Sequence, residues 1–258
     1  MSRQSKSSKH SHHSKSGGSS SSNNEDVVEQ VKSIVTLLYE VVSSRPEECE
    51  AYIPSARSAT SALDQIHFFR DPQRFAEQVW ILHGLQQFAF YDADAGSIRD
   101  VTEFCQTSWL RILRNFPDNV EVLNGLGSNW LQRSQSTLAQ IHQEEGDSSS
   151  QGSSSAGSPS DPRRQGPLYV EARGSLQPAV DFFARAVRSA DANGTTTGEL
   201  LASAAESQMS LGNVTAPPGD ERHFSHAIRY LRRAEATPGY TLSVYMQQYL
   251  NDYGRYVS

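Results

Sequence analysis

Apolar residues recur three and four positions apart along most of the chain, a spacing that places them on one face of an α-helix. The clearest run begins at Val27 and ends before Arg45-Pro46, because the residue before a proline disfavours helical backbone. A second run follows Asp71-Pro72, where an N-cap residue precedes a proline at the first helical position. No segment alternates apolar and polar residues between hairpin turns, as a half-buried strand would. The pattern therefore predicts an all-α protein.

Short connections separate the predicted helices. Residues 92–97 and 115–119 join successive apolar runs, and Pro54 interrupts a helical stretch at 47–69. Helices joined by connections this short pack antiparallel to one another. We therefore expect antiparallel helical hairpins stacked one on the next.

Two long segments lack the apolar residues that a packed helix needs. Residues 1–24 contain eleven serines and Met1 as their only apolar side chain, and residues 144–166 contain eight serines and only Ala156. Such segments cannot bury enough apolar surface to offset the entropy lost on ordering. We expect a disordered basic tail at 1–24 and a disordered insert at 144–166. The insert is either a solvated linker or a site of serine phosphorylation.

These two segments explain the composition and divide the charge. Only 36% of the 258 residues are hydrophobic, but the chain without the two segments comes close to the usual globular range. The net charge is −6, yet the tail carries four basic and no acidic residues, which leaves −10 elsewhere. An acidic body of this kind argues against nucleic-acid binding by the body as a whole.

The sequence shows no feature of membrane insertion or secretion. It has no apolar run long enough for a membrane helix, and its N-terminus lacks the apolar core of a secretory signal. Two cysteines are too few for a disulfide scaffold or a cysteine-built zinc site. We expect an intracellular protein, cytoplasmic or nuclear, with no membrane partner.

Small and large residues recur in a fixed order in the second half of the chain. Two first-helix patterns consist of Leu123, Leu126, Gly127 and Trp130, and of Leu201, Ala204, Ala205 and Gly212. The second-helix patterns that follow them are Ala179, Phe183 and Ala186, and then Ala227, Leu231 and Ala234 with Pro238. An earlier second helix carries Cys105, Trp109, Ile112 and Pro117, and a terminal capping helix carries Leu242, Tyr245, Met246 and Tyr249.

This order resembles the tetratricopeptide repeat (TPR), a 34-residue helical hairpin. The resemblance covers residues 97–256, with the insert at 144–166 inside one hairpin, and leaves 25–96 as an N-terminal helical region. Position 208 departs from the repeat, because Gln208 stands where an aromatic residue is usual. The resemblance implies a TPR-like solenoid of stacked hairpins. An irregular helical bundle with similar packing residues is the alternative.

No recognised catalytic or cofactor-binding pattern occurs in the sequence. It lacks the phosphate loop G-x-x-x-x-G-K-[ST], the zinc motif H-E-x-x-H and the nucleophile turn G-x-S-x-G. Cys49 and Cys105 lie in helical stretches, where an inert buried thiol is expected. We therefore expect no enzyme activity, no catalytic residue and no cofactor.

The histidines of the helical region have ordinary structural explanations. His67 and His83 stand beside apolar residues, as core histidines do. His223 and His226 are three positions apart on one predicted helix, a spacing compatible with a shared ligand. Neighbouring arginines would repel a cation, so a surface pair is the better interpretation. We expect no metal site.

In the TPR family, the first helix of each hairpin lines a concave surface that suits an extended peptide or a partner helix. Carried over by position, the resemblance implies a partner-binding set of Asn124, Ser128, Gln132, Glu206, Met209, Ser243 and Gln247. This set lacks the Lys, Arg and Asn cluster with which some family members clamp a terminal carboxylate. A second candidate surface is a basic helix face with Arg222, Arg229 and Arg233.

Two functions are compatible with these features. The first is a non-enzymatic protein–protein interaction scaffold or adaptor, a subunit of a larger intracellular complex. The alternative is a nucleic-acid-associated nuclear factor that uses the basic tail and the arginine-rich helix face. Nucleic-acid binding would weaken steeply with salt, whereas a scaffold would keep its partner. The sequence specifies neither the partner nor the oligomeric state.

Overall fold

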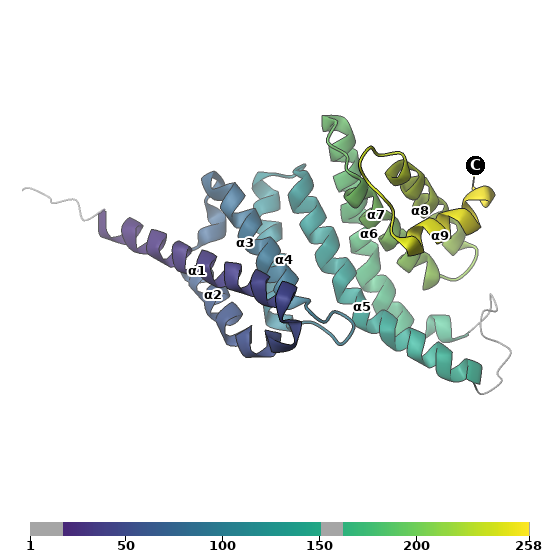
Figure 1. Ribbon diagram of the computed structural model, residues 1–258, viewed down its shortest axis with the longest axis horizontal. Coiled ribbons are helices and arrows are strands. Elements are labelled where there is room, and N and C mark those ends of the chain that lie inside the picture. Colours follow the sequence, from purple (N-terminus) through teal and green to yellow (C-terminus); the bar gives the residue numbers. More distant parts are fainter. Residues whose placement is uncertain (1–17, 151–161, 258) are drawn as a thin grey trace, which may run out of the picture.

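The secondary structure of the described residues, 18–150 and 162–257, is entirely helical in this computed structural model (Figure 1). The prediction of an all-α fold is confirmed. The α-helices are α1 (Gly18–Ser44), α2 (Ile53–Gln65), α3 (Phe75–Ala89), α4 (Arg99–Asn115), α5 (Val120–Ser150), α6 (Pro167–Asn193), α7 (Gly198–Asn213), α8 (Gly219–Glu235) and α9 (Val244–Tyr253). Short 3₁₀ turns occupy Pro46–Tyr52, Phe68–Arg70, Pro72–Arg74, Pro162–Gln165 and Gly254–Tyr256.

The helices pack mainly against their neighbours in sequence. From α3 to α8 each helix contacts the next, and the α5–α6 and α7–α8 pairs share the most extensive contacts. Helices α1, α3, α5 and α7 also contact one another in that order, so they form one layer of the molecule. Helix α9 lies against α8 at the C-terminal end (Figure 1).

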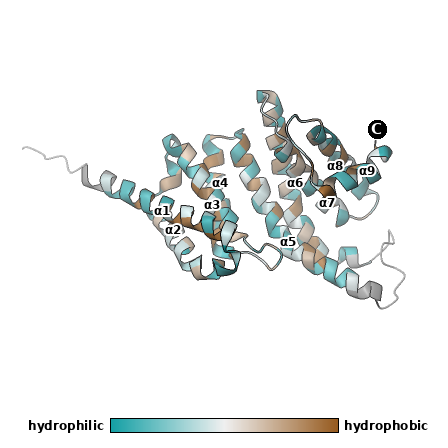
Figure 2. Ribbon diagram, in the orientation of Figure 1, coloured by the Kyte–Doolittle hydropathy of each residue, from teal (hydrophilic) through white to brown (hydrophobic). Residues whose placement is uncertain are grey.

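Two hydrophobic cores share helix α5. Val122 and Leu126 are buried with residues of α1 to α4, whereas Leu123 and Leu131 are buried with residues of α6 to α9. Figure 2 shows apolar residues concentrated where the helices meet. Because α5 contributes to both cores, it fixes the N-terminal helices relative to the C-terminal ones.

The α5–α6 hairpin closes on a glycine. A Cβ atom added at Gly127 would lie 3.0 Å from the ring of Phe183, which is fully buried. Gly212 of α7 has a similar relation to Phe224 of α8, at 2.6 Å. At these glycines α5 approaches α6, and α7 approaches α8, more closely than a larger side chain would allow. The predicted pairing of α5 with α6 across the insert is confirmed.

A buried polar cluster joins α3, α4 and α5. The indole Nε1 of Trp109 donates to Gln86 Oε1 at 3.0 Å, and Gln86 Nε2 donates to the carbonyl oxygen of Gly125, also at 3.0 Å. Asn129 Nδ2 donates to the same Gln86 oxygen at 3.0 Å. Because unpaired buried polar groups are costly, these bonds fix how the three helices sit against one another.

Helices extend into both segments that are predicted to be disordered. Helix α1 begins at Gly18, within the predicted tail, and α5 continues to Ser150, within the predicted insert. The hydroxyl of Tyr169 donates to the Glu145 carboxylate at 2.6 Å, which links the end of α5 to the start of α6. After the insert, Arg164 donates to the Thr215 carbonyl oxygen at 2.7 Å. The remaining parts of both segments, 1–17 and 151–161, lie outside the described residues.

Three single-residue expectations can be compared with the fold. Cys49 and Cys105 are free and buried as predicted, and burial raises the pKa of both thiols. The expectation for His67 is wrong: it is exposed, and its φ of 52° lets it turn the chain out of α2. His83 is half-buried, with its ring 5.2 Å from that of Trp109, and burial lowers its pKa. None of the helices described combines the length and apolarity that crossing a bilayer requires.

Candidate partner-binding trough between α5 and α7

Two hollows lie between α5 and α7, and residues of both helices line each of them. The two hollows together are called the α5–α7 trough. The larger measures about 500 Å³ and the smaller about 360 Å³. The larger is lined by Asp94, Gln135, Leu138, Ala139, Ile141, His142, Glu145, Glu206, Met209, Ser210, Asn213, Val214 and Tyr245. The smaller is lined by Val120, Glu121, Asn124, Thr195, Thr197, Glu199, Leu200 and Ser203.

Three of the seven predicted binding residues line this trough. Glu206 and Met209 of α7 lie in the larger hollow, and Asn124 of α5 lies in the smaller one. Ser128 and Gln132 are half-buried on α5, between Asn124 and the residues of the larger hollow. Five of the seven predicted residues thus lie on α5 and α7, and three of them line the two hollows.

The two predicted residues around α9 have other partners. The Ser243 hydroxyl caps α9 by accepting from Met246 N at 3.3 Å. Gln247 Nε2 donates to Glu235 at 3.0 Å and to Asn251 at 3.2 Å. Neither residue lines a hollow, whereas Tyr245 of the same helix reaches the larger one with 64% of its surface exposed. The repeat resemblance does not point to Tyr245 as a binding residue. Helix α9 follows the last hairpin and is not followed by a pairing helix, so its residues cannot be aligned with the repeat as those of α7 can.

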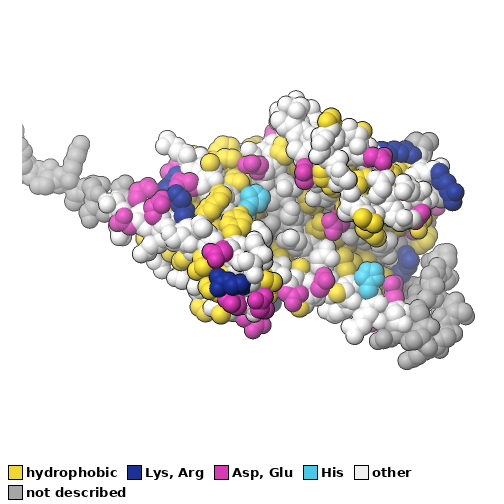
Figure 3. Space-filling view, in the orientation of Figure 1, with side chains coloured by type: hydrophobic (Ala, Val, Ile, Leu, Met, Phe, Trp, Pro, Cys, Tyr) yellow, Lys and Arg dark blue, Asp and Glu magenta, His cyan; other side chains and the backbone are white. Residues whose placement is uncertain are grey.

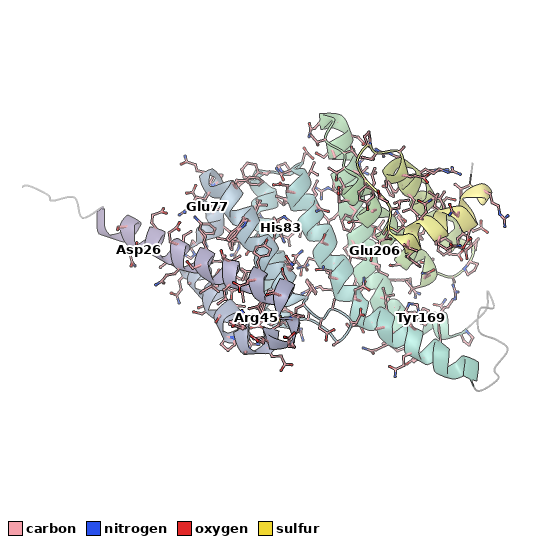
Figure 4. All side chains as sticks on the ribbon, viewed as in Figure 1. Asp26, Arg45, Glu77, His83, Tyr169 and Glu206 are labelled. Atoms are coloured by element: carbon pink, nitrogen blue, oxygen red, sulfur yellow. The ribbon has the colours of Figure 1, made fainter. Side chains whose placement is uncertain are left out.

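Glu206 is the most unusual group in the trough. Burial alone raises the pKa of its carboxyl, with no nearby cation to lower it. No hydrogen bond or ion pair to its carboxylate occurs among the described residues. Figure 4 shows Glu206 between α5 and the C-terminal helices. A desolvated and unpaired carboxylate is costly to the free protein, so the site is chemically prepared for an incoming positive charge.

Both hollows of the trough have acidic linings. Its lining contains Asp94, Glu145 and Glu206 in the larger hollow and Glu121 and Glu199 in the smaller, and neither lining includes a Lys or Arg. The single histidine of the lining, His142, has its Nδ1 4.0 Å from Glu145. On the face shown in Figure 3, Asp and Glu side chains are scattered across the molecule, whereas the Lys and Arg side chains lie toward its two ends.

The three arginines of the predicted basic helix face do not share one environment. Arg233 Nη2 lies 2.5 Å from Asp191 Oδ1, so an acidic neighbour neutralises it. Arg229 is exposed, and Arg222 lines a different groove of about 710 Å³ between α6 and α8. Arg188 also lines that groove. The three arginines predicted to act together therefore have three different surroundings.

The α6–α8 groove also contains the histidine pair. His223 and His226 are half-buried and line this groove. Burial lowers the pKa of both, and Arg222 lowers them further. His223 Nδ1 lies 2.8 Å from Gln208 Oε1, so the pair contacts a side chain of α7. Within the described ranges no three His, Cys, Asp or Glu side chains gather closely enough to hold a metal ion.

Comparison of the chain with protein-family models, with curated proteins and with solved structures gave no match in any of the three. The function is therefore argued from the fold and the trough alone.

Proposed function

We propose that this chain is a non-enzymatic protein-interaction scaffold, a subunit of a larger complex in the cytoplasm or nucleus. The α5–α7 trough binds a segment of the partner protein. The observation that carries the proposal is the trough itself, in which Glu206, Met209 and the exposed Tyr245 meet from two helices. A concave strip with mixed apolar and polar lining suits an extended peptide or a partner helix.

The architecture proposed for this scaffold is a TPR-like solenoid. In support, α5 with α6 and α7 with α8 form successive hairpins, each with a glycine of the first helix against an aromatic ring of the second. The first helices of the hairpins, α5 and α7, face the trough. In TPR-like proteins, this layer carries the binding surface.

Site-specific photo-crosslinking tests the proposal. A photoreactive phenylalanine analogue replaces Tyr245 in the trough, and in a control it replaces Val170 of α6, which is 54% exposed and lines neither hollow. In native lysate, the trough position should give a discrete adduct with one protein, and the control position should not. The same adducts from both positions, or none from Tyr245, would contradict the proposal.

The nucleic-acid alternative has one observation in its favour. Arg188 and Arg222 line the α6–α8 groove, and neither has an ion pair within the described part of the chain. If nucleic acid binds there, its affinity should fall steeply as salt rises and should drop on Arg222→Gln. The photoreactive analogue can also be placed on α8. Nucleic-acid adducts from that position, and none from the trough, would favour this alternative over the scaffold.

A further inference from the structure

We infer that the segment bound by the α5–α7 trough is basic and amphipathic, and that one of its Lys or Arg side chains pairs with the Glu206 carboxylate. This inference rests on the proposed function, because it names the chemistry of the partner for the same trough.

The first step is the state of Glu206 itself. The carboxylate is half-buried against apolar neighbours and has no partner within the described part of the chain. The raised pKa of the group has desolvation as its only cause. Removing a charge from water without a partner is unfavourable, and an opposite charge within hydrogen-bond distance offsets part of that cost. An incoming ammonium or guanidinium group would supply it.

The second step is the charge around Glu206. Glu145 of α5 and Asp94 of the α3–α4 connection line the same hollow, and the lining holds no Lys or Arg. His142 is the only group there able to become cationic, and it lies beside Glu145 rather than Glu206. Three carboxylates around one hollow repel an acidic segment and attract a basic one, so charge complementarity selects the partner.

The third step is the apolar half of the hollow. Met209 and Leu138 form part of its lining, and the ring of Tyr245 stands largely exposed at its edge. Met209 is only 3% exposed, so the apolar surface that a partner can cover is mainly that of Leu138 and Tyr245. A purely polar basic segment would leave this surface uncovered. The chain's own residues 1–17, basic but with Met1 as the only apolar side chain, are therefore a poorer occupant than an amphipathic segment of another protein.

Fluorescence anisotropy with designed peptides tests the inference on the full-length chain. The probe is a labelled amphipathic helix with Leu on one face and Lys on the other, and its matched counterpart has Glu in place of Lys. The Leu/Lys peptide should bind at least about tenfold more tightly than the Leu/Glu peptide. Glu206→Gln, which keeps the shape and removes the charge, should weaken Leu/Lys binding roughly tenfold or more. Glu47→Gln, an exposed glutamate outside the trough, should leave it unchanged.

A third variant separates failure of the inference from failure of the proposed function. If Tyr245→Ala weakens binding and Glu206→Gln does not, the trough binds the peptide but Glu206 does not select its charge, which overturns the inference alone. If neither variant changes binding, the peptide binds elsewhere, which overturns both. If removal of residues 1–17 strengthens binding about tenfold, the trough is occupied by the chain's own tail, which also overturns the inference.

Discussion

Glu206 and Gln208 stand two positions apart on α7 and so point to opposite sides of the helix. Glu206 faces the acidic trough and has no partner among the described residues, whereas Gln208, 6% exposed, faces the α6–α8 groove and contacts His223. Gln208 Oε1 has a hydrogen-bonding partner, and within the described part of the chain the Glu206 carboxylate has none. Of the two, Glu206 is the residue whose chemistry calls for a ligand.

Glu206→Gln should stabilise the free protein although it weakens partner binding. Burial raises the pKa of Glu206 in the folded state, so the folded chain holds this proton more readily than the unfolded chain. The carboxyl's contribution to stability is therefore full below the ordinary glutamate pKa and is lost as pH rises through the raised value. At neutral pH the glutamine should increase the free energy of unfolding by up to about 1 kcal/mol.

Urea unfolding of both proteins across the mildly acidic to neutral range checks this effect. The difference between them should grow as pH rises and vanish at acidic pH, where Glu206 is protonated. A glutamine variant less stable than the parent at neutral pH would show that Glu206 has a structural partner, contrary to the account.

At this scale the sequence predicts some positions and not others. Glu206 and Met209, which the repeat resemblance predicts, line the larger hollow. Ser243 does not line the trough, since a serine before a helix prefers to cap it. His67 was expected in the core from its apolar neighbours, but the chain turns at that residue and exposes it.

Helix α5 is the element on which the fold depends most. It contributes side chains to both hydrophobic cores and one wall of the trough, and its Gly125 lies against the ring of Trp109. A Cβ at Gly125 would lie 2.6 Å from that ring. Trp109 cannot easily move away, because its Nε1 is bonded to Gln86 and its side chain is fully buried.

Gly125→Ala should therefore destabilise the protein, by about 1–3 kcal/mol, as overpacking of a core does. Gly174→Ala on α6 is the matched control, because a Cβ there would meet nothing within 4 Å. The control should stabilise the protein by about 0.5–1 kcal/mol, since alanine favours a helix over glycine. Thermal or chemical unfolding measures both, and equal effects of the two variants would contradict the packing described for α5.

The helices themselves could be predicted from apolar spacing, but several of their ends could not. The extension of α5 to Ser150 and of α1 back to Gly18 contains serine, glycine and charged residues without apolar periodicity. Adding a turn to a helix that is already formed costs little conformational entropy compared with starting a new helix. These turns therefore need no apolar residues, and the apolar spacing of the sequence does not predict them. The link between Tyr169 and Glu145 is a long-range contact and equally invisible to it.

At the scale of the whole molecule, the helices separate two surfaces of opposite character. The α5–α7 trough carries carboxylates and no Lys or Arg in its lining, and the α6–α8 groove carries Arg188, Arg222 and two histidines with Asp181 as its acidic residue. The net charge of −6 is thus an average over distinct faces. Counting charged residues in the sequence gives only the net charge. Which charges lie in the trough and which in the α6–α8 groove depends on how the helices pack, with α7 contributing to both linings.

The central claim is that the trough is the binding surface. Hydrogen–deuterium exchange of the full-length chain, with and without the Leu/Lys peptide, tests it most directly. The account predicts slower exchange on peptide binding in residues 135–145 of α5 and 203–214 of α7, with no change in 222–233 of α8. Slower exchange in α8, or no change in α5 and α7 despite measurable binding, would contradict it.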